Sequence, residues 1–284
     1  MKNNRRRLLL AGGLACLGLG PVQAESSTGS LAEFRERGRL RIAVYNDFLP
    51  FSDKGRRGID VELARALAGK LGLAAEIVGF NADEDMNDDL RNMVWKGHYL
   101  GTQPADVMMH VPVDEGLAKA NDRVRIFGAY YREGLALARN PARVPAVSGS
   151  AAVALEVFTR EKIGVETASL ADSFLLAVLN GRLQDNIVHF TTTEQAAVAL
   201  AGGQVAAVLG PRSELEMALA ARSGWPIETP QLPELKVNSW PLGMAVKVQE
   251  AELAAALGRA LAELQQDGTV AAIFKRHGIS HLPA

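Results

Sequence analysis

The stretch that decides the fold is residues 40–72, which read LRIAVYNDFLPFSDKGRRGIDVELARALAGKLG. The first five residues, Leu40 to Val44, alternate in the manner of a β-strand. From Gly58 to Gly72 the apolar side chains recur at helical spacing, at Ile59, Val61, Leu63, Ala64, Leu67 and Leu71. A strand followed by a helix is the opening unit of an α/β fold.

The same alternation continues after this unit. Residues 74–80 read as a strand, residues 81–95 as an acidic segment that opens a helix, and residues 105–110 as a buried strand. Strands that alternate with helices predict a mostly parallel sheet with helices on both faces.

A second unit of the same kind follows residues 140–145. Its predicted strands are 162–165, 187–190 and 206–209, and its predicted helices are 170–180, 193–201 and 213–221. The remaining strand 239–248 and the helices 250–267 and 270–277 have no sheet of their own. We therefore expect an α/β protein of two lobes, with residues 31–138 and 237–284 in lobe 1 and residues 139–236 in lobe 2.

Composition narrows the class of protein. The chain has 284 residues, of which 48% are hydrophobic and 22% are charged, with one cysteine. These values exclude disorder and a disulfide scaffold. The formal net charge is −1, and no cluster of Lys and Arg occurs after residue 7. This pattern argues against nucleic acid as a partner.

The first residues have the pattern of a signal peptide. Lys2 and three arginines precede an apolar run, Leu8 to Leu19, which ends at Val22-Gln23-Ala24. We expect cleavage after Ala24, by either the general or the twin-arginine export route, and a periplasmic mature chain. The run is too short for a spanning helix, which needs about 20 residues. Cys16 would leave with the peptide; a lipoprotein at Cys16 is the alternative.

A resemblance then covers nearly all of the mature chain. The carrying motifs are LRIAV (40–44) with LPFS (49–52), GIDVELA (58–64), AYY (129–131), IGV (163–165) and IFKRHGI (273–279). In this order they resemble type II periplasmic solute-binding proteins of family 3, which serve ATP-binding-cassette importers. The resemblance implies a two-lobed fold whose lobes are joined by two crossover strands, a small-molecule solute and an inner-membrane permease as partner.

The chain departs from the amino-acid binders of that family at two points. The family's Arg for the ligand carboxylate falls near Ala120 and Asn121 here, and its second-lobe Asp is replaced in Gly210-Pro211-Arg212. We therefore do not expect an α-amino acid as ligand. Residues 83–99, 105–108 and 111–112 are instead similar to the branch associated with quinoprotein, that is PQQ-dependent, alcohol and methanol dehydrogenases.

Ligands of such folds sit beyond the carboxyl ends of the strands, and that rule selects the candidate residues. Aromatic, acidic and imidazole groups there suit organic or cationic solutes, and helix-start hydroxyls suit anions. The candidate ligand-binding residues are Tyr45, Asp47, Phe48, Phe51, Trp95, His98, Tyr99, His110, Glu166, Thr167, Ser169 and Arg212. For several of them a structural role is the alternative: Phe48 and Phe51 as a staple, Ser169 as an N-cap and Trp95 as core.

Metal and catalytic patterns are weak. Asp83, Asp85 and Asn87 begin like a calcium loop, but Asp88 and Val94 stand where glycine and glutamate are required, so a helix start is favoured. No nucleophile elbow, phosphate loop or HExxH motif occurs. We expect no metal, no cofactor and no enzyme; a dehydratase using Glu166 with nearby Lys162 is the remaining catalytic alternative.

The sequence thus predicts a monomeric periplasmic binding protein with one of two roles. The first is an accessory of a PQQ-dependent dehydrogenase or its cytochrome, held through an exposed surface. The second is the receptor of an importer for a small polar or anionic solute.

Overall fold

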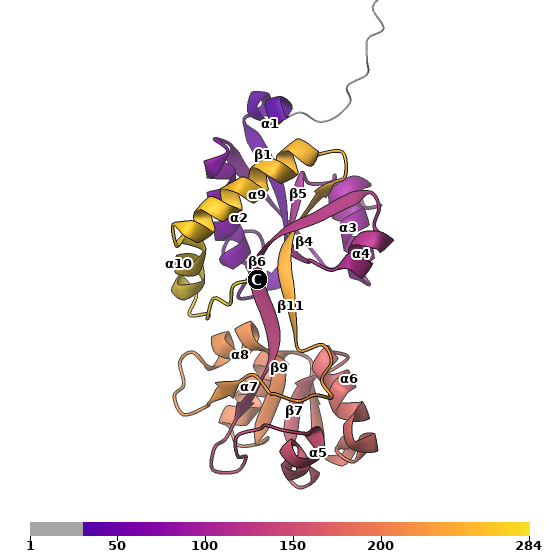
Figure 1. The fold of residues 1–284 in the computed structure, drawn as a ribbon, viewed down its shortest axis with the longest axis vertical. Coiled ribbons are helices and arrows are strands. Elements are labelled where there is room, and N and C mark those ends of the chain that lie inside the picture. The colour runs from indigo at the N-terminus through magenta and orange to yellow at the C-terminus, as the bar shows by residue number, and fades with distance from the viewer. Residues whose placement is uncertain (1–30) are drawn as a thin grey trace, which may run out of the picture.

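The computed structural model describes residues 31–284, which form two α/β lobes joined by two long strands (Figure 1). The predicted signal peptide, its cleavage site and Cys16 lie outside the described residues. In the described part of the chain, no helix is long and apolar enough to cross a membrane.

Lobe 1 is built on a mixed sheet with strand order β4-β1-β5-β11-β6. Strand β1 (Arg39–Tyr45) pairs in parallel with β4 (Ala74–Phe80) and with β5 (Val107–Pro112). Strand β11 (Ser239–Lys247) runs antiparallel between β5 and β6 (Val124–Arg139). The expected parallel units are therefore present, and the last strand of the chain joins their sheet.

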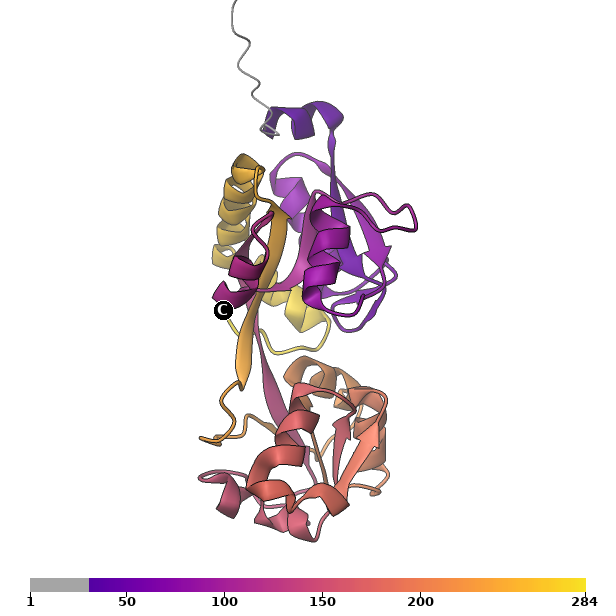
Figure 2. The same cartoon turned by 90° about the vertical axis from the view of Figure 1, so that its right-hand side faces the viewer.

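Helices cover both faces of this sheet (Figures 1 and 2). One face carries α2 (Ile59–Lys70), α9 (Ala251–Gln266) and α10 (Thr269–Arg276); the other carries α3 (Met86–Leu90), the π-helical turn η1 (Arg91–Trp95) and α4 (Glu115–Ala120). The alternation read in β1 explains this, since Ile42 and Val44 pack in the first layer and Ala43 and Tyr45 in the second. Short α1 (Leu31–Arg37) packs on the first layer through Phe34.

Lobe 2 continues the sheet in the order β6-β9-β7-β8, with β10 (Ile227–Glu228) also paired to β6. Strands β7 (Ile163–Glu166), β8 (Ile187–Phe190) and β9 (Ala207–Pro211) are parallel to one another. Its helices are α5 (Ala151–Ala154), α6 (Leu170–Ala177), α7 (Thr193–Ala201) and α8 (Arg212–Leu219), with 3-10 turns at Glu156–Thr159, Val178–Gly181 and Gln184–Asn186. They form two separate apolar layers, as in lobe 1.

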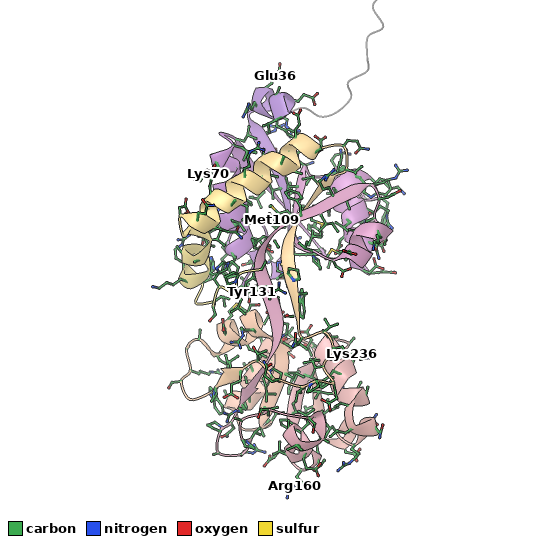
Figure 3. All side chains as sticks on the ribbon, in the orientation of Figure 1. Glu36, Lys70, Met109, Tyr131, Arg160 and Lys236 are labelled. Atoms are coloured by element: carbon green, nitrogen blue, oxygen red, sulfur yellow. The ribbon has the colours of Figure 1, made fainter. Side chains whose placement is uncertain are left out.

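Two strands, β6 and β11, connect the lobes. The first half of β6 pairs with β11, and its last residues, Leu135 to Arg139, pair with β9 of lobe 2. Tyr131 on β6 lies where the two lobes meet (Figure 3). Trp240 on β11 packs against apolar clusters of both lobes. This junction confirms the predicted two-lobed architecture with two crossover strands.

The motif GIDVELA joins the start of α2 to the loop after β1. Gly58 has φ 122°, and a Cβ atom there would lie 2.2 Å from the carbonyl oxygen of Phe51. Only glycine tolerates that conformation and that contact. The backbone N–H of Asp60 then donates to the Phe51 carbonyl at 2.9 Å. The hairpin of β2 (Asp47–Phe48) and β3 (Ser52–Asp53), which carries Phe48 and Phe51, is thereby fixed on the helix.

The prediction of one helix opened by residues 81–95 is wrong in its bounds. The helix begins only at Met86, because Asp85 caps it by accepting the backbone N–H groups of Asn87 and Asp88. It then widens into the π-helical turn Arg91–Trp95. The acidic run is a capped helix start, as the failed calcium pattern indicated.

Candidate functional site

A cavity of about 380 Å³ lies between the lobes. Lobe 1 contributes Asp47, Phe48 and Leu49, and lobe 2 contributes Glu166, Thr192, Glu194, Glu214 and Met217. Asp47 follows β1, Glu166 ends β7, Thr192 follows β8, and Glu214 lies in the helix after β9. Parallel strands of both lobes therefore end at this cavity, the place where α/β folds bind ligands.

The lining of this interlobe cavity is acidic. It holds four carboxylates and no Lys or Arg. Burial raises the pKa of Glu214 to about 7, and the nearby carboxylates of Glu166 and Glu133 act in the same direction. A cation placed here would relieve the repulsion between these carboxylates, whereas an anion would add to it.

Glu166 is held in place at the start of α7. One of its carboxylate oxygens accepts the backbone N–H of Thr193 at 3.0 Å and the Thr193 hydroxyl at 2.9 Å. A carboxylate at a helix N-terminus is favourably placed in the field of the helix dipole. Glu166 is therefore a fixed negative charge at the cavity wall.

The groups at the start of α6 that the sequence suggested for anion binding form hydrogen bonds within the protein instead. Ser169 caps α6 by accepting the backbone N–H of Asp172 at 3.1 Å, and the exposed Thr167 hydroxyl donates to the Phe190 carbonyl at 3.0 Å. The carboxylate of Asp172 accepts the Ala168 N–H at 2.8 Å. Both hydroxyls and two of the backbone N–H groups, those of Ala168 and Asp172, therefore already have partners within the protein.

A second cavity, of about 460 Å³, adjoins the first on the lobe 1 side and shares Asp47 and Phe48 with it. We call it the aromatic cavity, because its lining includes the rings of Tyr45, Phe48, His110 and Trp240. The Phe48 and His110 rings meet edge to face at 4.6 Å between centroids, and Tyr45 and Phe48 at 5.7 Å. Apolar groups dominate the rest of its lining.

His110 is fixed from behind by a buried network. Its Nδ1 lies 3.0 Å from one carboxylate oxygen of Asp60, and the other oxygen accepts the Tyr130 hydroxyl at 2.6 Å. All three side chains are buried. His110 also has φ 63°, in the left-handed region, which turns the chain as β5 passes the cavity. The imidazole is thus held at a set angle in the cavity wall.

A third cavity, of about 330 Å³, lies on lobe 1 beside β4 and contains His98. The His98 Nε2 is 3.7 Å from Asp83, too far for a hydrogen bond. Burial raises the pKa of Asp89, which accepts the Tyr45 hydroxyl at 2.7 Å. Within residues 31–284, no group of three or more His, Cys, Asp or Glu side chains is placed to hold a metal ion.

The other sequence candidates lie apart from the interlobe cavity. Phe51 is 1% exposed in the core of lobe 1, and Trp95 is half-buried under the guanidinium of Arg123. Tyr99 is 87% exposed on a loop. Arg212 lines neither the interlobe nor the aromatic cavity; it contacts Glu216 at 3.2 Å and Thr229 at 2.8 Å.

The acid–base pair of the dehydratase alternative is not formed. Lys162 precedes β7 and Glu166 ends it, so the two residues are about 13 Å apart along the strand. Sequence reasoning in turn missed Glu214, Glu194 and Asp60 as site residues. Asp60 lies in the motif GIDVELA, which was used only for the resemblance. The strand-end rule indicated the residues just after Pro211, but the sequence does not show which side of the following helix faces the cleft.

No family profile matches the chain, and a search of curated proteins finds no match either. Solved structures do match. An ancestral cationic amino acid solute binding protein is 20% identical with a TM-score of 0.66, over 87% of this chain and 99% of that one. An amino acid ABC transporter substrate-binding protein from Streptococcus pneumoniae, bound to L-arginine, is 16% identical with a TM-score of 0.59, over 89% and 99%.

The same fold also occurs outside transport. A histidine kinase sensor domain with similarity to periplasmic binding proteins is 19% identical with a TM-score of 0.57, over 87% of this chain and 98% of that one. At these identities the matches establish the fold alone. This chain has the two-lobed α/β fold of periplasmic binding proteins, as the sequence predicted.

Proposed function

We propose that the chain is a periplasmic solute receptor that closes its two lobes on a small organic cation without a carboxylate. The observation that carries this proposal is the interlobe cavity, where Asp47 from one lobe and Glu166, Glu194 and Glu214 from the other surround a space with no basic lining residue. Such a cavity favours positive charge.

The same lining explains why the proposed ligand has no carboxylate. A ligand carboxylate is usually bound by an arginine in bidentate fashion. Here Arg123 and Arg125 are exposed near the start of β6, in the part that pairs with the end of β11, and Arg212 is engaged by Glu216. A carboxylate in the cavity would meet four carboxylates and no basic side chain. The similar structures, one bound to L-arginine and one described as a cationic amino acid binder, support a positively charged ligand. The acidic lining of this chain's cavity argues against a ligand with the carboxylate of an amino acid.

The test compares two probes that differ by one carboxylate: agmatine and L-arginine. Each is titrated calorimetrically into the mature chain at pH 8, with butyrate as the anion. We expect agmatine to bind and, at 100 times its dissociation constant, to stabilise the fold by about 2.7 kcal/mol. Tighter binding of L-arginine or of butyrate than of agmatine would overturn the proposal.

Import is the transport role that fits this receptor, with an inner-membrane permease as partner. Export through residues 1–24 would place it in the periplasm. N-terminal sequencing of the exported protein should then begin at Glu25; retention of residues 1–24 would contradict this part of the proposal.

The quinoprotein-accessory role is a second candidate. It is favoured by one observation, the exposed pair Tyr99 and Leu100, which are 87% and 75% exposed beside His98. Paired apolar side chains at a loop tip are suited to a protein contact. Replacing both by serine should then weaken capture of a PQQ-dependent dehydrogenase or its cytochrome from periplasmic extract; unchanged capture, or none by the parent chain, would count against this role.

A further inference from the structure

The aromatic cavity extends the cation site into lobe 1. The two cavities share Asp47 and Phe48, so one molecule at the junction can contact both. Their linings differ in kind: the interlobe cavity carries four carboxylates, and the aromatic cavity carries Asp47 as its one carboxylate, the amides Asn46 and Asn81, and otherwise rings and apolar side chains. A ligand that fits both must itself have a charged part and an apolar part.

The rings of the aromatic cavity are set in position before any ligand arrives. Asp89 holds the Tyr45 hydroxyl at 2.7 Å, and Asp60 holds the His110 imidazole at 3.0 Å. Phe48 packs edge to face on both rings, at 5.7 and 4.6 Å between centroids. Fixed rings at such angles receive another flat ring by edge and offset contacts.

Part of the cavity wall comes from the crossover strand β11. Trp240 and Leu242 of β11 line the same cavity as the loop after β1, and Trp240 also packs on the apolar clusters of both lobes. A ring bound here would touch a residue whose surroundings involve both lobes. Its binding is therefore coupled to the junction that the lobes share.

We propose that the solute is an arylalkyl ammonium ion, an aromatic ring joined by a short chain to a protonated amine, with no carboxylate. The ring occupies the aromatic cavity between Phe48 and Trp240, and the ammonium group lies among Asp47, Glu166 and Glu214. This inference rests on the proposed function, the binding of an organic cation in the cleft.

The reverse placement, a quaternary ammonium inside the aromatic cavity, is disfavoured by the charge distribution. Aromatic rings attract cations, but three of the four carboxylates line only the interlobe cavity. Electrostatic attraction falls with distance, so the positive end is drawn out of the aromatic cavity toward these carboxylates. Choline serves as the probe for this alternative.

The experiment titrates the unmodified mature chain with 2-phenylethylamine, n-butylamine, L-phenylalanine and choline at pH 8. We expect 2-phenylethylamine to bind at least roughly tenfold more tightly than each of the other three, because n-butylamine and choline lack the ring and L-phenylalanine adds a carboxylate. Binding of n-butylamine or choline as tight as that of 2-phenylethylamine would overturn the inference.

A variant pair locates the ring. Phe48→Leu keeps an apolar side chain and should weaken 2-phenylethylamine binding roughly tenfold while leaving n-butylamine nearly unchanged. The control, Val153→Ala, shortens an exposed apolar side chain of lobe 2 that lines neither cavity. An equal loss for both amines in Phe48→Leu, or the same loss in the control, would contradict the inference.

Failure of the inference and failure of the proposed function give different results. If agmatine and n-butylamine bind but the aryl amine has no advantage, the cation site stands and the aromatic assignment falls. If neither agmatine nor any of the amines binds, both the proposed cation site and the aromatic assignment are wrong.

Discussion

The two lobes present different chemistry to the same cleft. Lobe 1 contributes fixed rings, Tyr45, Phe48 and His110, backed by a buried carboxylate, Asp60. Lobe 2 contributes carboxylates near the starts of helices, Glu166, Glu194 and Glu214.

Under the proposed function, this difference divides ligand recognition between the two lobes. In lobe 1 the strand ends meet an apolar layer; Asp60, His110 and Tyr130 are buried and satisfy one another, and Asp47 is the exposed carboxylate. In lobe 2 the strand ends are capped by helices whose N-termini stabilise negative charge, as at Glu166 and Thr193. We infer that lobe 1 selects the shape of the ligand and lobe 2 its charge.

The largest expected effect is on folding, and it separates the two lobes. Asp60→Ala leaves the Tyr130 hydroxyl and the His110 imidazole without their buried partner, and should lower the free energy of unfolding by about 3 to 5 kcal/mol. The matched carboxylate of lobe 2 is Asp172, whose partner His189 is 40% exposed. Asp172→Ala should cost about 1 to 3 kcal/mol. Urea denaturation measures the loss of unfolding free energy in both variants. Equal losses would contradict the expected difference between the buried network of Asp60 and the partly exposed pair of Asp172 and His189.

The next effect is on ligand charge recognition. Glu214→Gln removes a half-buried carboxylate of the cleft and should weaken agmatine binding about 10- to 100-fold at pH 8, the range for one charge-assisted hydrogen bond. The control is Glu156→Gln in the same lobe, where Glu156 pairs with exposed Arg182 away from the cleft. Calorimetric titration of both variants makes the comparison. Retained affinity in Glu214→Gln would remove lobe 2 from charge selection.

The affinity for a cation should also depend on pH. The pKa of Glu214 is raised to about 7, so its carboxylate gains charge between about pH 6 and pH 8 in the free protein. Agmatine keeps its own charges over this range, and its affinity should therefore rise with pH, by at most about tenfold per unit. Asp47, Glu166 and Glu194 line the same cavity as Glu214. The buried Glu133 also acts on Glu214, and burial raises the pKa of Glu133 as well. Titrations at several pH values should lose most of this dependence in Glu214→Gln; a full dependence in that variant would contradict the assignment.

The same shift predicts a stability effect of opposite sign. A carboxyl whose pKa is higher in the folded state than in the unfolded chain stabilises the fold at low pH, and the contribution is lost as pH rises toward about 7. Glu214→Gln should consequently raise the melting temperature at pH 8 and change it little at pH 5. Thermal melts at the two pH values test this, and a destabilised variant at pH 8 would show that the charged carboxylate supports the fold.

The smallest effect is expected at the loop tip of lobe 1. Tyr99→Ala removes a side chain that is 87% exposed, and should change stability by less than about 0.5 kcal/mol. Agmatine binding should be unchanged. A larger loss in urea denaturation would mean that this loop contributes to the lobe 1 fold.

Much of the fold was predictable because it depends on local patterns. The strand 187–190 and the helix 193–201 were predicted with the bounds they have in the structure, since a Thr cap and a Gly stop frame the helix. The helix from Met86 was missed in its start because Asp85, one acidic residue among several, turned out to be the cap.

The site was predictable only in part, because it depends on which way side chains turn after a strand ends. Tyr45, Asp47, Phe48, His110 and Glu166 were all selected by the strand-end rule and do line the two cavities. Arg212 and Glu214 follow the same strand two residues apart, and a helix sends such neighbours to different sides. The sequence offered the arginine, whereas the glutamate lines the cleft. The sequence left the sign of the ligand open between anion and cation, and the acidic lining favours the cation.

The most direct test of the division between the lobes is a crystal structure of the chain with agmatine at pH 8. The account predicts the ligand between the lobes, with a nitrogen about 2.7 to 2.9 Å from carboxylate oxygens of Glu214 and Glu166, the distance of a charge-assisted hydrogen bond. Asp47 would approach from lobe 1. An agmatine bound outside the cleft, or held without contact to either glutamate, would contradict it.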